Sequence, residues 1–221
     1  MIEPLIQPER HGSNVGDAFH LVIPSLPGVT LSGPTPDTGW TEERIAAAFV
    51  TLMHRLGYDR YGVQGGDSGA GICRAMGRLD PESVVGVHVN AAANGFIPWH
   101  TVESEERDSQ SDLDRERLDR MAAWMAAETG YFTIQGTKPE TLASTGAHAG
   151  GNHWSNGTDQ TATGVPTGVA VLKNDIAIQR YSEGANRITH SSDFETSGHF
   201  AAMETPDLLT GHFRAFFQIV Q

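Results

Sequence analysis

The sequence has very little cysteine and no long apolar run. Its single cysteine, Cys73, excludes an internal disulfide and any zinc site built from cysteines. No apolar stretch approaches the roughly 20 residues that a membrane-spanning helix needs. Residues 1–10 are acidic and interrupted by proline, unlike a secretory signal peptide. We therefore expect a soluble, cytoplasmic protein.

Positive charge is also scarce. The chain has 15 Lys and Arg against 27 Asp and Glu, which gives a formal net charge of −12 at pH 7. Such a chain lacks the basic patch that binds nucleic acid or an anionic membrane, so we expect neither as a partner. The 221 residues suffice for one large domain. The 25 glycines indicate many tight turns rather than disorder.

Strand-like and helix-like segments alternate along the chain. Short apolar or β-branched runs predict strands, and apolar residues at helical spacing predict helices between them. The predicted strands are 19–24, 61–64, 84–89, 168–172 and a weaker one near 187–189, and the main predicted helices are about 42–56, 71–79 and 206–220. This alternation is typical of an α/β fold with a mostly parallel sheet flanked by helices.

The alternation is interrupted in the middle of the chain. Residues 104–128 are densely charged and carry apolar positions at helical spacing, which predicts an amphipathic helix. Residues 143–164 are small and polar, which predicts a loop. We interpret 97–164 as a short insert over the core. The core then consists of an N-terminal part, 1–96, and a C-terminal part, 165–221.

A glycine-rich turn, residues 65–70, follows the strand predicted at 61–64. A nucleophile elbow needs small residues two positions before and two after the nucleophile, because its backbone is strained. The pattern fits Asp67 and also Ser68, each with small residues at both positions. A serine-protease interpretation of 66–69 requires an all-β chain, which the predicted helices contradict. A plain turn without catalysis is the third alternative.

The two candidate nucleophiles imply different substrates. Ser68 would form an ester with an acyl substrate, and water can hydrolyse that ester; attack by serine on an alkyl carbon would form an ether that such an enzyme could not release. Asp67 attacking an alkyl carbon would form an ester that water can cleave. Asp67 therefore implies epoxides or alkyl halides, and Ser68 implies esters. The local pattern leaves both open, together with the turn that has no catalytic role.

Two further residues follow in the chain order of an elbow-based enzyme, which is nucleophile, acid and histidine. Asp175 comes just after the strand predicted at 168–172, and His199 lies in a loop before the last helix. Either residue taken alone is more often a structural or exposed group. The other histidines lack metal-ligand spacing, so we expect no metal site.

Several separate motifs occur in a fixed order: Phe19–Gly28, Ser32–Pro34, Gly39–Arg44, Leu56–Tyr61, Gln64–Asp67, Arg78–Glu82, Gly130–Leu142 and Gly198–Leu209. Together they resemble the epoxide hydrolases of the α/β-hydrolase superfamily, in particular the microsomal-type branch. The resemblance covers most of residues 16–142 and 165–217. It favours Asp67 over Ser68 as the nucleophile.

The resemblance also implies roles for individual residues. Asp67 would be the nucleophile, His199 the base that activates water, and Asp175 the acid that orients the base. The backbone N–H of Ser68 would donate to the oxyanion. Tyr131 matches a lid tyrosine whose hydroxyl bonds the epoxide oxygen, although a packed lid aromatic is the alternative. The implied partner is a small-molecule epoxide, and the reaction needs no cofactor.

The chain departs from the resemblance at its N-terminal side. It lacks a strand and the His-Gly-x-Pro loop that supplies a second oxyanion donor; His11 and Gly12 are not that loop, because Ser-Asn follows them. In the family's strand order, the missing strand lies between 19–24 and 61–64. These two segments must pair directly, or leave a sheet edge that recruits another chain and forms a homo-oligomer.

The predicted lid is also shortened. The family's second lid tyrosine would fall within 152–158, where His153 takes its place beside Trp154. We take His153 and Trp154 as substrate-binding candidates. The family's Gly-Tyr-Gly-x-Ser loop reads Gly-Val-Thr-Leu-Ser at 28–32, so its aromatic residue is absent.

Three hypotheses follow from the sequence. The first is an epoxide hydrolase, with a haloalkane-type dehalogenase as a variant that uses the same residues. The second is a truncated, weakly active or inactive homologue that serves as a binding or scaffold protein, because losing one oxyanion donor lowers the rate by ~10²–10³-fold. The third is an esterase that uses Ser68. The presence of Asp67, Asp175 and His199 together favours the first.

Overall fold

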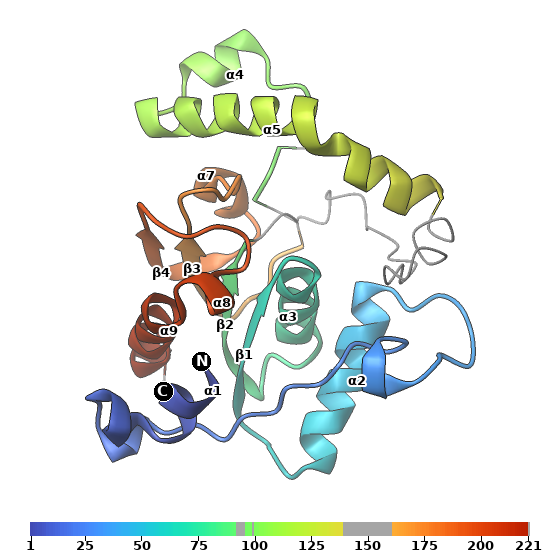
Figure 1. The fold of residues 1–221 in the computed structure, drawn as a ribbon, viewed down its shortest axis with the longest axis vertical. Coiled ribbons are helices and arrows are strands. Elements are labelled where there is room, and N and C mark those ends of the chain that lie inside the picture. Colours follow the sequence, from blue (N-terminus) through green and yellow to red (C-terminus); the bar gives the residue numbers. More distant parts are fainter. Residues whose placement is uncertain (92–95, 99, 139–160, 221) are drawn as a thin grey trace.

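The computed structural model describes residues 1–91, 96–98, 100–138 and 161–220 (Figure 1). Its centre is a four-stranded sheet in the order β1-β2-β3-β4, with every neighbouring pair parallel. The strands are β1 (Tyr61–Gly66), β2 (Val84–Asn90), β3 (Pro166–Val171) and β4 (Arg187–Asp193). Four predicted strands are therefore confirmed. Because all run in one direction, their carboxyl ends meet at one edge of the sheet, where ligands bind in open α/β sheets.

The strand predicted at 19–24 is wrong. This segment has no regular secondary structure and pairs with no strand in the described part of the chain. The N–H of Phe19 donates instead to the carbonyl of Leu5 at 2.9 Å, and its ring packs against Phe213 and Phe217. An apolar run becomes a strand only where a neighbouring strand accepts its backbone hydrogen bonds. The predicted direct pairing does not occur, and β1 is the edge of the sheet.

Helices cover both faces of the sheet. Helices α2 (Glu42–Arg55) and α3 (Ser68–Leu79) pack together on one face, and α9 (Pro206–Val220) covers the other (Figure 1). Thr41 caps the start of α2, because its side chain accepts the N–H of Arg44 at 3.4 Å. Shorter helical segments are α1 (Ile2–Ile6), three 3₁₀ turns (Pro8–His11, Val15–Asp17 and Thr30–Ser32), α7 (Gln179–Ser182) and α8 (Ala201–Glu204).

Two strand glycines let α9 lie close to the sheet. A Cβ atom at Gly86 would come within 2.8 Å of the Phe216 ring, and one at Gly168 within 2.6 Å. Side chains do not approach so closely, so glycine is required at both positions. The Phe216 ring is fully buried and takes the space that strand side chains would otherwise fill. The contact fixes the height of α9 above the sheet.

Three histidines lie between the sheet and α9. Nε2 of His88 on β2 is 2.9 Å from Nδ1 of His212 on α9, and the His212 ring lies 4.4 Å from that of His190 on β4. Burial lowers the pKa of His88 to about 3 and the pKa of His212 to about 4, with the neighbouring histidines adding to the effect. Both are therefore neutral at pH 7. Among the described residues, no group of three or more His, Cys, Asp or Glu is placed to hold a metal ion.

The insert forms two helices at the carboxyl edge of the sheet (Figure 1). The single helix predicted at 104–128 is divided into α4 (Ser104–Asp108) and the longer α5 (Asp112–Thr137). The division falls at Ser111, whose side chain caps α5 by accepting the N–H of Asp114 at 3.1 Å. A capping serine thus starts a second helix inside the predicted one.

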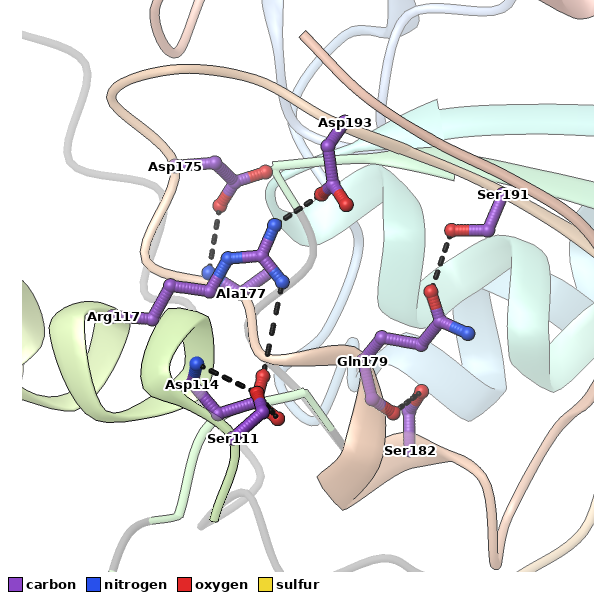
Figure 2. Close-up of polar contacts among 9 residues, drawn as sticks. All are labelled: Ser111, Asp114, Arg117, Asp175, Ala177, Gln179, Ser182, Ser191 and Asp193. Atoms are coloured by element: carbon purple, nitrogen blue, oxygen red, sulfur yellow. Dashed lines mark hydrogen bonds and ion pairs between the residues drawn. The ribbon is translucent and has the colours of Figure 1, made fainter. Parts of the chain in front are cut away.

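Ion pairs and hydrogen bonds join the insert to the C-terminal part of the core. Arg117 of α5 is buried and pairs with Asp193 at the end of β4 and with Asp114 one turn away (Figure 2). The Tyr181 hydroxyl of α7 donates to Glu106 at 2.9 Å. The segments that follow β3 and β4 therefore support the insert.

Two predictions about the chain's organisation remain open. The boundaries 1–96, 97–164 and 165–221 stay a prediction. The loop predicted at 143–164 lies mostly outside the described residues, which resume at 161. Within the described ranges, no helix is both long enough and apolar enough to cross a bilayer.

Candidate active site

Asp67 occupies a strained turn between β1 and α3. Its backbone has φ 55° and ψ −129°, in a region that residues with a Cβ rarely adopt. A Cβ at Gly65 would come within 2.3 Å of the carbonyl oxygen of Gly69, so only glycine allows the chain to turn this sharply. Of the two elbow interpretations, the geometry therefore matches the one centred on Asp67. Ser68 is the first residue of α3.

The Asp67 carboxylate is hydrogen-bonded at both oxygens. Its Oδ2 lies 2.9 Å from Nε2 of His199, and Oδ1 accepts from the N–H and the hydroxyl of Ser68 at 2.5 and 3.1 Å. The side chains of Asp67 and His199 are 45% and 49% exposed. The predicted nucleophile and base are thus in direct contact, and solvent can reach both.

This contact favours the ionised form of each partner. The hydrogen bond and positive charge of His199 lower the pKa of Asp67, against a smaller opposing effect of burial. The same hydrogen bond and the nearby carboxylates of Asp67, Asp175 and Glu204 raise the pKa of His199. Asp67 is therefore a carboxylate at neutral pH, which is the state a nucleophile requires.

Asp175 is buried in the loop that follows β3. The sequence predicted that it orients His199, but the described structure has no hydrogen bond between the two side chains. The hydrogen bonds of Asp175 in the described structure come from backbone N–H groups, including those of Ala91 to Oδ2 and Ala177 to Oδ1, both at 3.0 Å. Figure 2 shows the bond from Ala177. Burial raises the pKa of Asp175, and these N–H groups oppose that rise. Its charge nevertheless raises the pKa of His199, so the two groups are close without a hydrogen bond.

One backbone unit connects the two aspartates. Ala91, just after β2, accepts the N–H of Asp67 at 3.1 Å and donates its own N–H to Asp175. Its φ is 45°, an uncommon value for a residue with a Cβ. Ala91 was not among the residues predicted from the sequence, because contacts made by the backbone do not depend on which side chain the residue carries.

Ser68 is engaged with Asp67 rather than poised as a nucleophile. Its hydroxyl donates to Asp67, and the imidazole of His199 bonds to Asp67 as well. The backbone N–H of Ser68, the predicted oxyanion donor, is also bonded to the Asp67 carboxylate. It can serve an oxyanion only after the carboxylate has moved or reacted.

The other predicted site residues lie in the insert. Tyr131 belongs to α5, and the role of its hydroxyl remains a prediction. His153 and Trp154 lie outside the described residues. Phe200, whose ring centroid lies 4.9 Å from that of His199, is 66% exposed. Glu204, which no sequence pattern singled out, contacts the loop that carries His199.

A carboxylate at a strand–helix turn, in contact with a histidine from a loop before the last helix, matches the arrangement of hydrolases built on a parallel α/β sheet. The family described as alpha/beta hydrolase fold matches residues 8–130, more than half of the chain. The chain therefore belongs to the α/β-hydrolase family. This confirms the predicted fold class.

Two relatives extend the comparison. A Stigmatella aurantiaca (strain DW4/3-1) protein named "Putative epoxide hydrolase" is 28% identical over 271 residues, covering 99% of this chain and 60% of that protein. Epoxide hydrolase 1 of Oryctolagus cuniculus is 31% identical over 158 residues, covering 64% of this chain and 33% of that protein. The chain thus spans 60% of the first relative's length and a third of the second's.

Solved structures show the same fold. The structure of Aspergillus niger epoxide hydrolase matches 100% of this chain and 69% of its own, with a TM-score of 0.80 and 23% identity. The juvenile hormone epoxide hydrolase of Bombyx mori matches 89% of this chain and 64% of its own, with a TM-score of 0.69 and 21% identity. The predicted resemblance to epoxide hydrolases is confirmed by the curated relatives, and these structures confirm the architecture.

Proposed function

We propose that the protein is an epoxide hydrolase that opens a small-molecule epoxide to a vicinal diol through a covalent ester on Asp67. The observation that carries the proposal is the 2.9 Å contact between the Asp67 carboxylate and Nε2 of His199 at the strained turn. Relatives named as epoxide hydrolases support it. Asp67 serves as the nucleophile, His199 as the base and Asp175 as the acid that stabilises the charged base.

In the first step, a carboxylate oxygen of Asp67 attacks an epoxide carbon. The carbon–oxygen bond of the ring breaks, and the departing oxygen takes a proton, which we assign to the Tyr131 hydroxyl. The product is a hydroxyalkyl ester of Asp67. Esterification removes the negative charge that the Ser68 N–H binds in the resting protein. That N–H then becomes available to the carbonyl oxygen of the ester.

In the second step, His199 takes a proton from water, and the resulting hydroxide attacks the carbonyl carbon of the ester. The acyl–oxygen bond breaks, and the diol leaves with the proton returned by His199. The new carboxylic acid ionises, and the released proton restores the hydroxyl of Tyr131. His199 must be neutral to begin this step, and the carboxylate of Asp175 stabilises the imidazolium that forms.

Oxygen-isotope labelling tests the covalent route. During a single turnover of styrene oxide in ¹⁸O water with excess enzyme, the account predicts an unlabelled diol and one ¹⁸O atom in the peptide that contains Asp67. Direct addition of water to the epoxide would instead place the label in the diol. A labelled diol formed by a protein whose Asp67 peptide carries no ¹⁸O would contradict the mechanism.

The alternative functions give different results in the same assay. A haloalkane dehalogenase would convert a chloroalkane but not the epoxide. A binding or scaffold protein would convert neither, and the engaged Ser68 N–H is the observation that favours it. An esterase that uses Ser68 has less support, because the Ser68 hydroxyl bonds a carboxylate rather than an imidazole.

We also propose that the open edge of β1 allows two copies of the chain to associate. Gly62 and Gln64 of this edge strand are exposed, and the strand contains no proline or charged residue, the features that usually protect a sheet edge. Sedimentation velocity of the protein and of Gln64→Pro tests the proposal. A dimer that the substitution does not weaken would contradict it, as would a monomer at all concentrations. The cytoplasmic location remains a prediction, as does the role in detoxification that the resemblance to epoxide hydrolases implies.

A further inference from the structure

Glu204 at the end of α8 binds the backbone on both sides of His199. Its Oε2 accepts the N–H of Gly198 at 2.7 Å, and its Oε1 accepts the N–H of Phe200 at 3.1 Å. One carboxylate therefore bridges the N–H groups of the two residues that flank the catalytic histidine. Hydrogen bonds from backbone N–H groups to a charged acceptor are stronger than those to a neutral one.

The local backbone is shaped to admit this carboxylate. A Cβ at Gly198 would lie 3.2 and 3.3 Å from the two oxygens of Glu204, closer than most real Cβ contacts, so glycine eases the approach. The preceding residue, Ser197, has φ 72°, which turns the chain sharply into the His199 loop. Strained backbone persists only where surrounding contacts hold it, and the two bonds to Glu204 are such contacts.

The predicted acid does not provide this positioning. The described hydrogen bonds to Asp175 come from backbone N–H groups, those of Ala177 in its own loop and of Ala91 after β2 among them. Nε2 of His199 is hydrogen-bonded to the Asp67 carboxylate, and this carboxylate becomes an ester in the first step. After the first step, the loop backbone must therefore hold the imidazole in place for its reaction with water.

We propose that Glu204 is a positioning residue for His199: by holding the N–H groups of the residues before and after it, Glu204 keeps the base aimed at the Asp67 ester during hydrolysis. This inference rests on the proposed function. Glu204 touches neither substrate nor the reacting atoms. Its negative charge also favours the imidazolium form of His199, and this effect persists after Asp67 has been esterified.

Two substitutions separate the backbone contacts from the charge. Glu204→Gln keeps the size of the side chain, but it removes the charge and turns a donor towards one of the two N–H groups. Glu204→Asp keeps the charge but withdraws it by one methylene. Glu195→Gln is the matched control, because it removes one exposed carboxylate four residues before His199 that has no contact with the loop in the described structure.

The first measurement is amide hydrogen exchange of Gly198 and Phe200 by NMR. We expect both amides to exchange about tenfold faster in Glu204→Gln and in Glu204→Asp, because a charge-assisted hydrogen bond protects each of them. The rates should be unchanged in Glu195→Gln. Unchanged exchange at these two amides in both Glu204 variants would overturn the proposal. If one variant fails to fold, the other still decides.

The second measurement is steady-state turnover of styrene oxide. Both Glu204 variants should lower kcat by about ten- to a hundredfold and lower KM in similar proportion, because a misplaced base slows hydrolysis of the ester but not its formation. The ester on Asp67 should accumulate during turnover. Faster amide exchange with an unchanged kcat would show a contact that does not position His199, and would overturn the proposal.

A third measurement separates this proposal from the proposed function. The ¹⁵N shift of Nε2 in His199, assigned with His199→Gln, reports its hydrogen bond to Asp67 without any substrate. We expect that shift to change in both Glu204 variants and to remain in the control. If the protein converts no epoxide, the proposed function fails, whereas an unchanged Nε2 shift overturns the role of Glu204.

Discussion

Asp67 is strained in a way that helix capping alone does not require. It caps α3 by accepting the N–H of Ser68, but N-cap residues usually have an extended backbone, whereas Asp67 has φ 55°. A residue with an extended backbone could cap the helix without strain, so capping does not account for the strained turn. It places the second carboxylate oxygen against His199. Strain of this kind is concentrated at functional sites.

Asp67→Asn should abolish epoxide hydrolysis, because an amide cannot attack an epoxide carbon to form a hydrolysable ester. We expect kcat to fall by about 10³–10⁴-fold or more. Ser68→Ala should keep most of the activity, since it removes only the 3.1 Å hydroxyl contact and leaves the backbone N–H in place. Steady-state kinetics of both variants check this. Loss of activity in Ser68→Ala alone would instead support the esterase.

Gly65→Ala should disturb the turn, because its Cβ would meet the carbonyl oxygen of Gly69 at 2.3 Å. We expect the free energy of unfolding to fall by about 1–3 kcal/mol, with a loss of activity. Gly69→Ala is the matched control, since a Cβ there has no atom within 4 Å. Urea denaturation of both variants measures the difference. Equal stability would contradict the described turn.

Site residues that are marked by the neighbouring sequence could be predicted, whereas contacts that depend on the rest of the fold could not. The spacing of glycines around the turn leaves Asp67 and Ser68 as candidates, and the resemblance to epoxide hydrolases favours Asp67, whose carboxylate lies 2.9 Å from His199 in the structure. Whether Asp175 bonds His199 depends on which backbone N–H groups bind its carboxylate, and one of these, that of Ala91, comes from a segment far away in the sequence. The Glu204 carboxylate accepts hydrogen bonds from main-chain N–H groups, which every residue except proline has, so no sequence pattern predicts these contacts.

At the scale of elements, α9 is held to the sheet through buried neutral histidines. His88 and His212 have lowered pKa values of about 3 and 4, whereas in the unfolded chain each titrates near 6.5. As the pH falls below 6.5, the unfolded state binds protons that the folded state cannot accept. Stability is therefore fully present above pH 6.5 and is lost as the pH falls towards 4.

Between pH 7.5 and pH 5, each of the two histidines should lower the free energy of unfolding by about 2 kcal/mol. His88→Gln removes one of these titrations and should flatten the pH dependence by the same amount. His11→Gln, at an exposed position, should leave it unchanged. Urea denaturation across this pH range measures the slopes. Equal slopes in the protein and in His88→Gln would contradict the account.

The secondary-structure predictions are wrong where the structure of a segment depends on a neighbouring segment. Residues 19–24 have the composition of a strand, yet no adjacent strand in the described chain receives their hydrogen bonds. The strands β2 and β3 were predictable, because each lies between two others and is apolar on both faces. The break between α4 and α5 rests on one capping serine within a charged run.

At the scale of the whole molecule, the insert and the core meet through Arg117. Its guanidinium is buried and pairs with Asp193, which is half-exposed (Figure 2). Asp193→Asn should loosen α5 from the core and cost about 1 kcal/mol, a modest value because solvent screens the pair and Asp114 remains. Trypsin should then cleave α5 faster.

The matched control is Asp119→Asn, which removes the exposed pair between Asp119 and Arg107 inside the insert without touching the core. Its digestion rate should equal that of the unmodified protein. If both variants are digested alike, Arg117 does not join the insert to the core. The insert carries Tyr131, the proposed proton donor, and lies over the carboxyl edge of the sheet (Figure 1).

The central claim, that Asp67 forms a covalent ester that His199 hydrolyses, is tested most directly by intact-mass spectrometry of His199→Ala after mixing with styrene oxide. Without the base the ester should persist, so the account predicts a mass gain of one substrate molecule that maps to the peptide containing Asp67. Asp67→Asn,His199→Ala should gain no mass. A folded His199→Ala protein that forms no adduct, or forms one at another residue, would contradict the account.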